Sequence, residues 1–197
     1  GVNIAIGTDW LPTGSMNMTR ELACADSFNK NYLNNFFDDR QLWMMVTLNA
    51  ASVTATDDAI GLLAPGKVAD ISIFAIHGKP PYRGVIEAEP KDVALVLRAG
   101  KPLYGDDATI AALMPTGCDT VDVCTVSKKV CLMGEVGKTY DALKTAAGAN
   151  TYPAFACGVP MNEPSCLPKR PTATAGSTIY TGMPSATDSD GDGIENT

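Results

Sequence analysis

The sequence predicts an α/β fold that opens with a strand and a helix, continues with further strands, and ends in a cysteine-rich extension. Residues 2–6 alternate apolar and polar side chains with the period of two that is typical of a strand, and Gly7 then allows a turn. Five of the six cysteines lie between residues 118 and 166. With 197 residues, of which 45% are hydrophobic, the chain can bury a core and still carry a tail.

Charge and hydropathy exclude two classes of protein. The net charge is −7, and no cluster of Lys and Arg is longer than the pairs at 128–129 and 169–170, so we expect no nucleic-acid binding. No apolar run reaches the length of about 18 residues that a membrane-spanning helix needs, and no signal peptide is visible at the start of the sequence. A membrane span is therefore not expected.

Patterns of apolar residues and turn signals predict the order of the elements. The predicted elements are a helix over 20–28, a helix over 41–48, a short helix over 49–53, a strand over 68–74, a hairpin of residues 93–97 and 101–104, one or two short strands within 118–131, and a helix over 137–147. Asn17 or Thr19 can cap the first helix, and Gly100 sets the hairpin turn. Residues 148–187 are rich in Pro, Gly, Ser, Thr and Ala, which is typical of an extended wrap followed by a linker.

Asp9 is the candidate catalytic residue because it follows the first predicted strand directly. In a parallel α/β barrel, the C-terminal ends of the strands carry the active site, and a carboxylate there can be a metal ligand or a general base. The alternative is an aspartate that only caps a helix or stabilises a turn. These ten residues alone do not decide between the two roles.

Several short motifs stand in a specific order after this strand. They are Thr8-Asp9, residues 11–17, Asn49-Ala50-Ala51, the turn and strand from Gly61 to Ile73, and residues 96–104. In this order they resemble the C-terminal part of the metal-dependent amidohydrolase superfamily, in the branch of imidazolonepropionase-like, cytosine-deaminase-like and chlorohydrolase-like enzymes. The resemblance covers residues 1–107.

The resemblance implies a particular architecture. Residues 1–58 would be the end of a TIM-type (β/α)8 barrel with its last strand and helix, and residues 59–107 would be part of a small β-sandwich. Beyond them we expect a disulfide-stapled, cysteine-rich extension over 108–170 and a linker with an acidic tail over 171–197. A chain that begins inside a barrel's final strand is expected to be the C-terminal piece of something longer.

The resemblance also implies a chemistry. It predicts hydrolysis of a non-peptide carbon–nitrogen bond in a small molecule, by an amidohydrolase or deaminase, with Asp9 beside a divalent transition metal, expected to be zinc, that activates water. Trp10 and Asn17 are the candidate substrate-binding residues, although Asn17 is equally suited to capping a helix. His77 is the only histidine and no metal role is expected for it. The other metal ligands should therefore lie on the N-terminal remainder of the enzyme, present as a separate chain or a missing segment. The sequence leaves open whether the chain forms a homo-oligomer.

The cysteines predict disulfides and an oxidising compartment, hence an extracytoplasmic location. The candidates are Cys24, Cys118, Cys124, Cys131, Cys157 and Cys166. None of their spacings is Cys-x-x-Cys, which disfavours a structural zinc site. Six cysteines permit 15 pairings, and either Cys24 joins the cluster or one thiol stays free. We favour a bond from Cys24 to a tail cysteine.

The acidic tail carries oxygen ligands at alternate positions. Asp188, Asp190 and Asp192 are candidate calcium ligands, and the pattern resembles the front half of thrombospondin type 3 and dockerin-like repeats, without the bidentate acid that closes such a loop. A solvated acidic tail is the alternative. The rival to the hydrolase is consequently a non-catalytic, extracellular, disulfide-rich interaction module with a calcium-binding tail.

Overall fold

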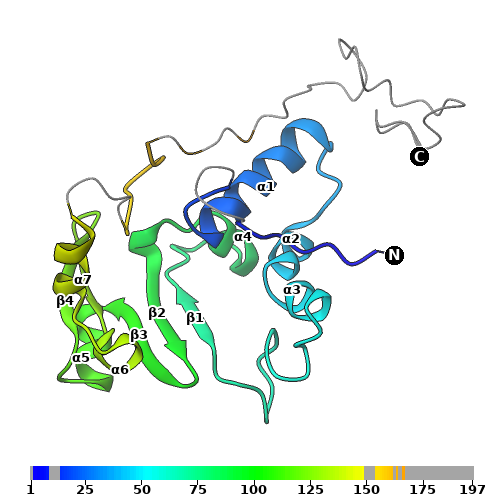
Figure 1. The fold of residues 1–197 in the computed structure, drawn as a ribbon. Helices are drawn as coiled ribbons and strands as arrows, with labels where there is room; N and C mark the ends of the chain where they lie inside the picture. The colour runs from blue at the N-terminus through cyan, green and yellow to red at the C-terminus, as the bar shows by residue number, and fades with distance from the viewer. Residues whose placement is uncertain (1, 9–13, 149–153, 162, 164–165, 167–197) are drawn as a thin grey trace, which may run out of the picture. The chain divides into compact units, whose positions relative to one another are not determined.

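The fold was examined in a computed structural model of the chain, which describes residues 2–8, 14–148, 154–161, 163 and 166. The chain divides into two compact units, residues 1–164 and 165–197. All helices and strands named below belong to the first unit. Figure 1 shows their order along the chain.

Four helices form the helical region of the first unit. They are α1 (Met18–Tyr32), α2 (Asp39–Met45), α3 (Leu48–Val53) and α4 (Pro81–Ile86). The Asn17 side chain caps α1, and Asp38 forms a capping box with Gln41 at the start of α2, which satisfies N–H groups that a helix leaves without partners. Apolar side chains from three of these helices meet in one core, made of Leu22, Leu42, Met45 and Ile86.

Five strands form one antiparallel sheet in the order β1-β2-β3-β5-β4. Their bounds are β1 (Ile71–Phe74), β2 (Val93–Arg98), β3 (Lys101–Asp106), β4 (Asp119–Val123) and β5 (Val126–Val130). Ala99 and Gly100 both have positive φ, 49° and 78°, in the two-residue turn between β2 and β3. This geometry matches the twist of the strands and explains the glycine at the second turn position.

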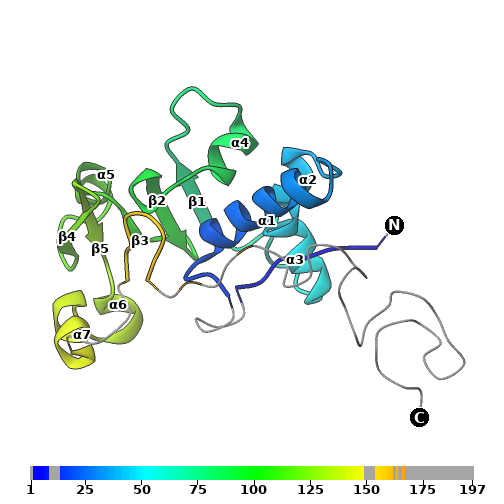
Figure 2. The ribbon, with the colours of Figure 1, turned by 90° about the horizontal axis from the view of Figure 1, so that it is seen from above.

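Four further short elements complete the described helices and strands of the first unit. They are η1 (Pro90–Asp92), α5 (Asp107–Leu113), α6 (Met133–Val136) and α7 (Tyr140–Ala147). Helix α5 packs its fully buried Ile110 against Leu95 of β2 and Cys131, which gives the sheet a second core. In Figure 2, α1, α2 and α3 lie toward one end of the sheet, beside β1, whereas α5, α6 and α7 lie toward the end formed by β4 and β5.

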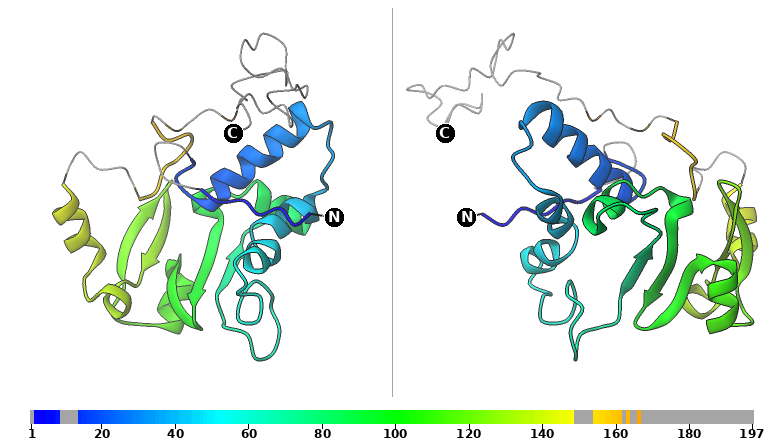
Figure 3. Two further views of the ribbon diagram at one scale, coloured as in Figure 1. Left: turned by 45° about the vertical axis from the view of Figure 1, so that its right-hand side comes forward. Right: turned by 180° about the vertical axis from the view of Figure 1, so that it is seen from behind.

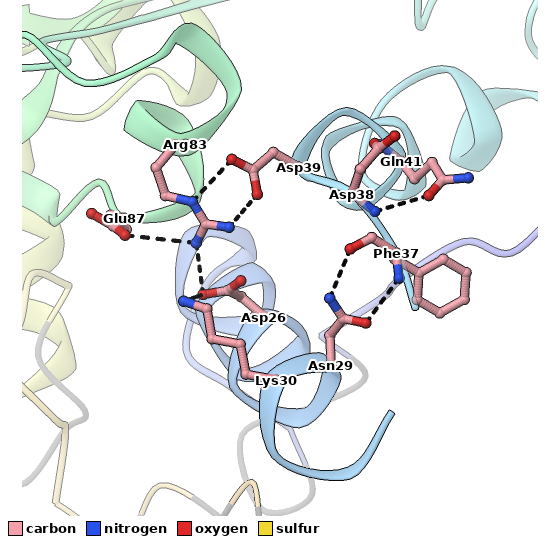
Figure 4. Close-up of polar contacts among 9 residues, drawn as sticks. All are labelled: Asp26, Asn29, Lys30, Phe37, Asp38, Asp39, Gln41, Arg83 and Glu87. Atoms are coloured by element: carbon pink, nitrogen blue, oxygen red, sulfur yellow. Dashed lines mark hydrogen bonds and ion pairs between the residues drawn. The ribbon is translucent and has the colours of Figure 1, made fainter. Parts of the chain in front are cut away.

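A network of ion pairs links three helices of the helical region, α1, α2 and α4 (Figure 4). Arg83 of α4 donates to Asp26 of α1 at 2.9 Å and pairs through its other nitrogens with Asp39 of α2. The hydrogen bond with Asp39 raises the pKa of Arg83, burial opposes this, and Asp26 adds to the rise. Asp26 is buried, and its Oδ1 atom has no hydrogen-bond partner among the described residues. Arg83 therefore compensates a charge that would otherwise be costly inside the protein.

Most predicted elements are present, but the first predicted strand is not. Residues 2–6 carry no strand pairing within the described residues, because a strand needs a hydrogen-bonded neighbour and none of β1–β5 lies beside this segment. The predicted strand over 68–74 is shorter, since Val68–Asp70 still belong to the preceding turn region. The described residues thus show a mixed α/β fold with an antiparallel sheet, and the barrel stays a prediction.

Candidate functional site

The segment that leads to Asp9 rests on α2 and α3 (Figure 3). The Ile6 amide donates to the Met45 carbonyl at 3.0 Å, and the Asn49 side chain donates to the Ile4 carbonyl at 3.1 Å. The Ile6 side chain also packs against the core of the helical region. The sequence motif at Asn49 therefore has a structural purpose here, because it anchors the N-terminal segment to α3.

Asp9 and Trp10 themselves lie outside the described residues, but the residues on either side of them are in contact. A Cβ atom on Gly14 would come within 1.5 Å of the Thr8 carbonyl oxygen, so only glycine allows the backbone to pass there. Thr8 and Gly14 thus bring together the two ends of the stretch that contains both candidates. This gives the glycine of residues 11–17 a physical role that the sequence pattern did not reveal.

Asn17 acts as the N-cap of α1. Its Oδ1 atom accepts hydrogen bonds from the Arg20 amide at 3.0 Å and from the Thr19 hydroxyl at 2.8 Å. Ser15 is tied to the same helical turn, because its amide donates to Glu21 at 3.1 Å. The capping role expected for Asn17 is confirmed, and its role toward substrate stays a prediction.

A cavity of about 870 Å³ lies beside Asn17. Residues of α1, α2, α3 and strands β1, β2 and β3 line it, and most of the lining is apolar. Among its polar groups, Asp70 accepts the Ala99 amide at 2.7 Å, and the Tyr104 hydroxyl donates to the Pro90 carbonyl at 3.3 Å. Burial, with a smaller effect of Asp106, raises the pKa of Tyr104 to about 12. The described lining of the cavity is therefore mainly apolar, with Asp70 and Tyr104 among its polar side chains.

The described residues contain no group of three or more His, Cys, Asp and Glu side chains placed to hold a metal ion. His77 donates from Nε2 to Asp92 Oδ1 at 2.9 Å, at the edge of the sheet. Burial tends to raise the pKa of Asp92, but the Glu89 amide and His77 outweigh burial and hold it below its usual value. The only histidine of the chain thus stabilises the turn before β2.

The disulfide prediction is confirmed. Cys118 bonds Cys131 across the β4–β5 hairpin, and Cys124 bonds Cys157. The remaining two cysteines, Cys24 and Cys166, are also disulfide-bonded, so the chain has three disulfides and no free thiol. The calcium candidates Asp188, Asp190 and Asp192 lie outside the described residues. Within the described part, no helix has the length and apolar character needed to cross a membrane.

The segment after α7 makes further contacts to the body of the first unit. Phe155 stacks on Tyr104 with ring centroids 5.2 Å apart, and Glu163 accepts from Arg20 Nε at 2.8 Å. Phe155 also lines the cavity. Sequence reasoning missed these contacts, since no local pattern links residues that are tens of positions apart.

Comparison with known proteins gives two similarities. The sequence model described as "Amidohydrolase family" matches residues 1–103. A 5'-deoxyadenosine deaminase of Methanothermobacter thermautotrophicus is 32% identical over 116 residues, which cover 54% of this chain and 27% of the relative. The chain therefore spans about a quarter of the length of that curated relative. No solved structure matches the chain.

Proposed function

The chain belongs to the amidohydrolase family, and from this we propose that it is the part of a metal-dependent hydrolase that carries the catalytic aspartate, Asp9. The proposed reaction is hydrolysis of a carbon–nitrogen bond in a small molecule. The observation that carries the proposal is the family match over residues 1–103, which contains Asp9 and its flanking contacts.

Asp9 has a defined role in this proposal. Its carboxylate accepts the proton of the attacking water and passes it to the leaving nitrogen, which is general acid–base catalysis by one group. Thr8 and Gly14, which are in contact, would hold together the two ends of the stretch that contains Asp9. Trp10 and Asn17 are proposed to contact the substrate.

The described residues do not fit a metal site by themselves. They contain no cluster of three donor side chains, and the imidazole of His77 is held by Asp92. We propose that the metal expected from the family, of which zinc is the favoured candidate, is held mainly by residues outside this chain, with Asp9 beside it. The N-terminal remainder of the enzyme is therefore its first proposed partner.

Deamination is the favoured form of the reaction. The relative named above is a deaminase by its description, and its match extends over 116 residues. We therefore propose an amino-substituted heterocycle, such as an aminopurine nucleoside, as the substrate class. Release of the amino group as ammonia gives the reaction a direct readout.

The test uses the complete enzyme and two matched aspartate variants. Asp9→Asn keeps the shape of the side chain but removes the proton acceptor, so ammonia release from an aminopurine nucleoside should fall at least about a hundredfold. Asp58→Asn, a change at an exposed position in a turn, is the control and should keep full turnover. Equal rates for Asp9→Asn and the wild type would reduce Asp9 to a structural residue.

Two further proposals concern the compartment of the protein and the acidic tail. Three disulfides favour an oxidising, extracytoplasmic compartment. We also propose that Asp188, Asp190 and Asp192 bind calcium, on the strength of the sequence pattern alone. Calcium titration of the complete protein, followed by calorimetry, would detect such a site, and the triple Asp→Asn variant would remove the signal.

A further inference from the structure

One ion pair joins the cysteine-rich extension to the first turn of α1. Both carboxylate oxygens of Glu163 accept hydrogen bonds from Arg20 Nε at 2.8 Å, and a second nitrogen of Arg20 donates to the same carboxylate. The side chain of Glu163 is 4% exposed and that of Arg20 is 24% exposed. The two residues are 143 positions apart, so the fold of the chain brings them together.

A buried ion pair of this kind is better suited to fixing positions than to adding stability. Removing both charges from water is costly, and the attraction between them repays this cost only when the geometry is good. The planar guanidinium presents several donors in a fixed arrangement, so a carboxylate that accepts from two of its nitrogens also fixes its orientation. The pair therefore holds the Arg20 side chain in one place.

The Glu163 carboxylate is itself firmly placed by the segment that carries it. We call this segment, residues 154–161 with Glu163, the strap. The Phe155 ring stacks on Tyr104 of β3, and the disulfide of Cys157 ties the strap to the turn between β4 and β5. A side chain can position another precisely only when its own backbone is held in this way.

Arg20 belongs to the turn of α1 that carries a candidate substrate residue. Its amide donates to Asn17 Oδ1 at 3.0 Å, and the Asn17 carbonyl accepts the Glu21 amide at 3.1 Å. The Glu21 carboxylate in turn accepts the Ser15 amide at 3.1 Å. The turn is thus a connected set of hydrogen bonds, in which a shift of Arg20 would be passed on to Asn17.

We propose that Glu163 is a positioning residue, which acts through Arg20 to fix the first turn of α1 and, with it, the side chain of Asn17. This inference rests on the proposed function, in which Asn17 contacts the substrate. The match to the family ends at residue 103, so the extension supplies this carboxylate from outside the matched region. The strap would therefore add a determinant of substrate binding to the hydrolase.

The alternative is a strap that only holds the extension in place. In that case, loss of the Glu163 charge would lower the stability of the fold but leave substrate binding by the folded enzyme unchanged. A positioning role predicts a change in substrate binding itself. Since a displacement of about 1 Å can change a rate about a hundredfold, we expect an effect of about tenfold from a loosened turn.

The first experiment measures ammonia release by the complete enzyme, with adenosine as the aminopurine nucleoside. Glu163→Gln keeps the shape of the side chain and removes its charge, so KM should rise about tenfold with kcat changed by less than about threefold. Arg20→Lys keeps a cation opposite Glu163 but loses the fork of donors, and it should raise KM at least about threefold.

The matched control breaks another ion pair between Arg and Glu. Glu135 of α6 pairs with Arg98 of β2 at 3.1 Å, and Glu135→Gln should change KM by less than about twofold. An unchanged KM in Glu163→Gln would overturn the proposal, even if the melting temperature fell. An equal rise of KM in Glu135→Gln would overturn it too.

A double-mutant cycle tests whether Glu163 acts through Arg20. In the background of Arg20→Gln, the further change Glu163→Gln should alter KM by less than about twofold, because the contact is already lost. A second rise of about tenfold in that background would show that Glu163 acts by another route, and it would overturn the proposal.

Hydrogen exchange of the same native proteins tests the positioning without reference to turnover. The amides of Arg20 and Glu21 should exchange about tenfold faster in Glu163→Gln than in the wild type, and at the wild-type rate in Glu135→Gln. Unchanged exchange in Glu163→Gln would overturn the proposal.

The outcomes also separate this proposal from the proposed function. Faster exchange in Glu163→Gln, in a protein that releases no ammonia, would keep Glu163 as the residue that holds the first turn of α1 and remove the proposed function. Normal ammonia release, with KM and exchange unchanged in Glu163→Gln, would keep the proposed function and remove the positioning role.

Discussion

The helical region and the cysteine-rich extension depend on disulfides to different degrees, since the helical region contributes one disulfide-bonded cysteine, Cys24, and the extension contributes Cys118, Cys124, Cys131, Cys157 and Cys166. In the helical region, α1, α2 and α4 meet around the core of Leu22, Leu42, Met45 and Ile86, and Arg83 joins their charged side chains. The extension shares a second core with β2, made of Leu95, Ile110 and Cys131, and adds the Cys118–Cys131 and Cys124–Cys157 disulfides. Both ends of these two disulfides lie in the extension, which therefore combines apolar packing with covalent bonds, as small disulfide-rich domains commonly do.

The physical reason lies in the sequence of each region. Helices α6 and α7 have no fully buried residue, so they contribute little hydrophobic stabilisation. By contrast, α1 and α2 each bury side chains against their neighbours. Loss of a disulfide should therefore affect the extension most, and loss of Arg83 should affect the helical region most.

The largest effect should come from removing the Cys124–Cys157 disulfide. This bond closes a loop of 33 residues, and the chain-entropy estimate for such a loop is about 4 kcal/mol of stability. The double change Cys124→Ser with Cys157→Ser should release Phe155 from Tyr104, which would reduce the aromatic circular dichroism of the extension. Urea unfolding followed by that signal measures the loss.

The control for this change lies in the same turn. Thr125→Ala leaves the disulfide intact at an exposed position with the same positive φ range, and it should change stability by less than about 0.5 kcal/mol. If the double serine variant destabilised the helical region as much as the extension, the two regions would unfold as one, and the disulfide would not be a local stabiliser of the extension.

The next largest effect is expected for Arg83→Met. Asp26 is 7% exposed, and among the described residues its buried carboxylate would keep Lys30 alone as a cationic partner without Arg83. Removing one partner of a buried ion pair typically costs about 3 kcal/mol or more. The free energy of unfolding, measured by far-ultraviolet circular dichroism in urea, should fall by about this amount.

Two further variants sharpen this test. Adding Asp26→Leu to Arg83→Met removes the uncompensated charge, so the double variant should recover much of the lost stability. Lys91→Met breaks an exposed ion pair with Glu89 and should cause no measurable loss. An Arg83→Met protein as stable as the wild type would show that the ion-pair network adds nothing to the helical region.

Local signals in the sequence predicted much of the fold. The cap at Asn17, the hairpin around Gly100 and the helix that begins near Asp38 depend on residues within one or two turns, and all three are present. The sequence did not predict α4 or α5, because short helices such as Pro81–Ile86 lack a full apolar period. The link between Arg83 and Asp26 spans 57 positions and left no local pattern.

The candidate site was predictable only in part. Its capping residue, Asn17, follows from a general preference at helix N-termini, but the contact between Thr8 and Gly14 depends on the path of the chain between them. The strand expected at residues 2–6 shows the same limit. Alternation within a segment predicts that it can form a strand, whereas its pairing requires a neighbour that the segment does not encode.

The smallest expected effect is a pH dependence at the edge of the sheet, where Asp92 joins η1 to His77. The pKa of Asp92 is lowered in the fold because its carboxylate accepts from the Glu89 amide at 3.0 Å and from His77 at 2.9 Å, and these bonds outweigh burial. A carboxyl group whose pKa is lower in the folded state stabilises the protein above its usual pKa of about 4. That stabilisation is lost as the pH falls through the folded value. Asp92→Asn can still accept the Glu89 amide, so it removes chiefly the charge.

We therefore expect Asp92→Asn to be slightly less stable than the wild type at pH 6, with a difference that shrinks as the pH is lowered below about 4. Urea unfolding at a series of pH values between about 6 and 2.5 measures this difference. Asp58→Asn, an exposed change without this environment, should show no such convergence. A constant difference between Asp92→Asn and the wild type over the whole series would mean that the geometry of the cap, and not the charge of Asp92, stabilises the turn before β2.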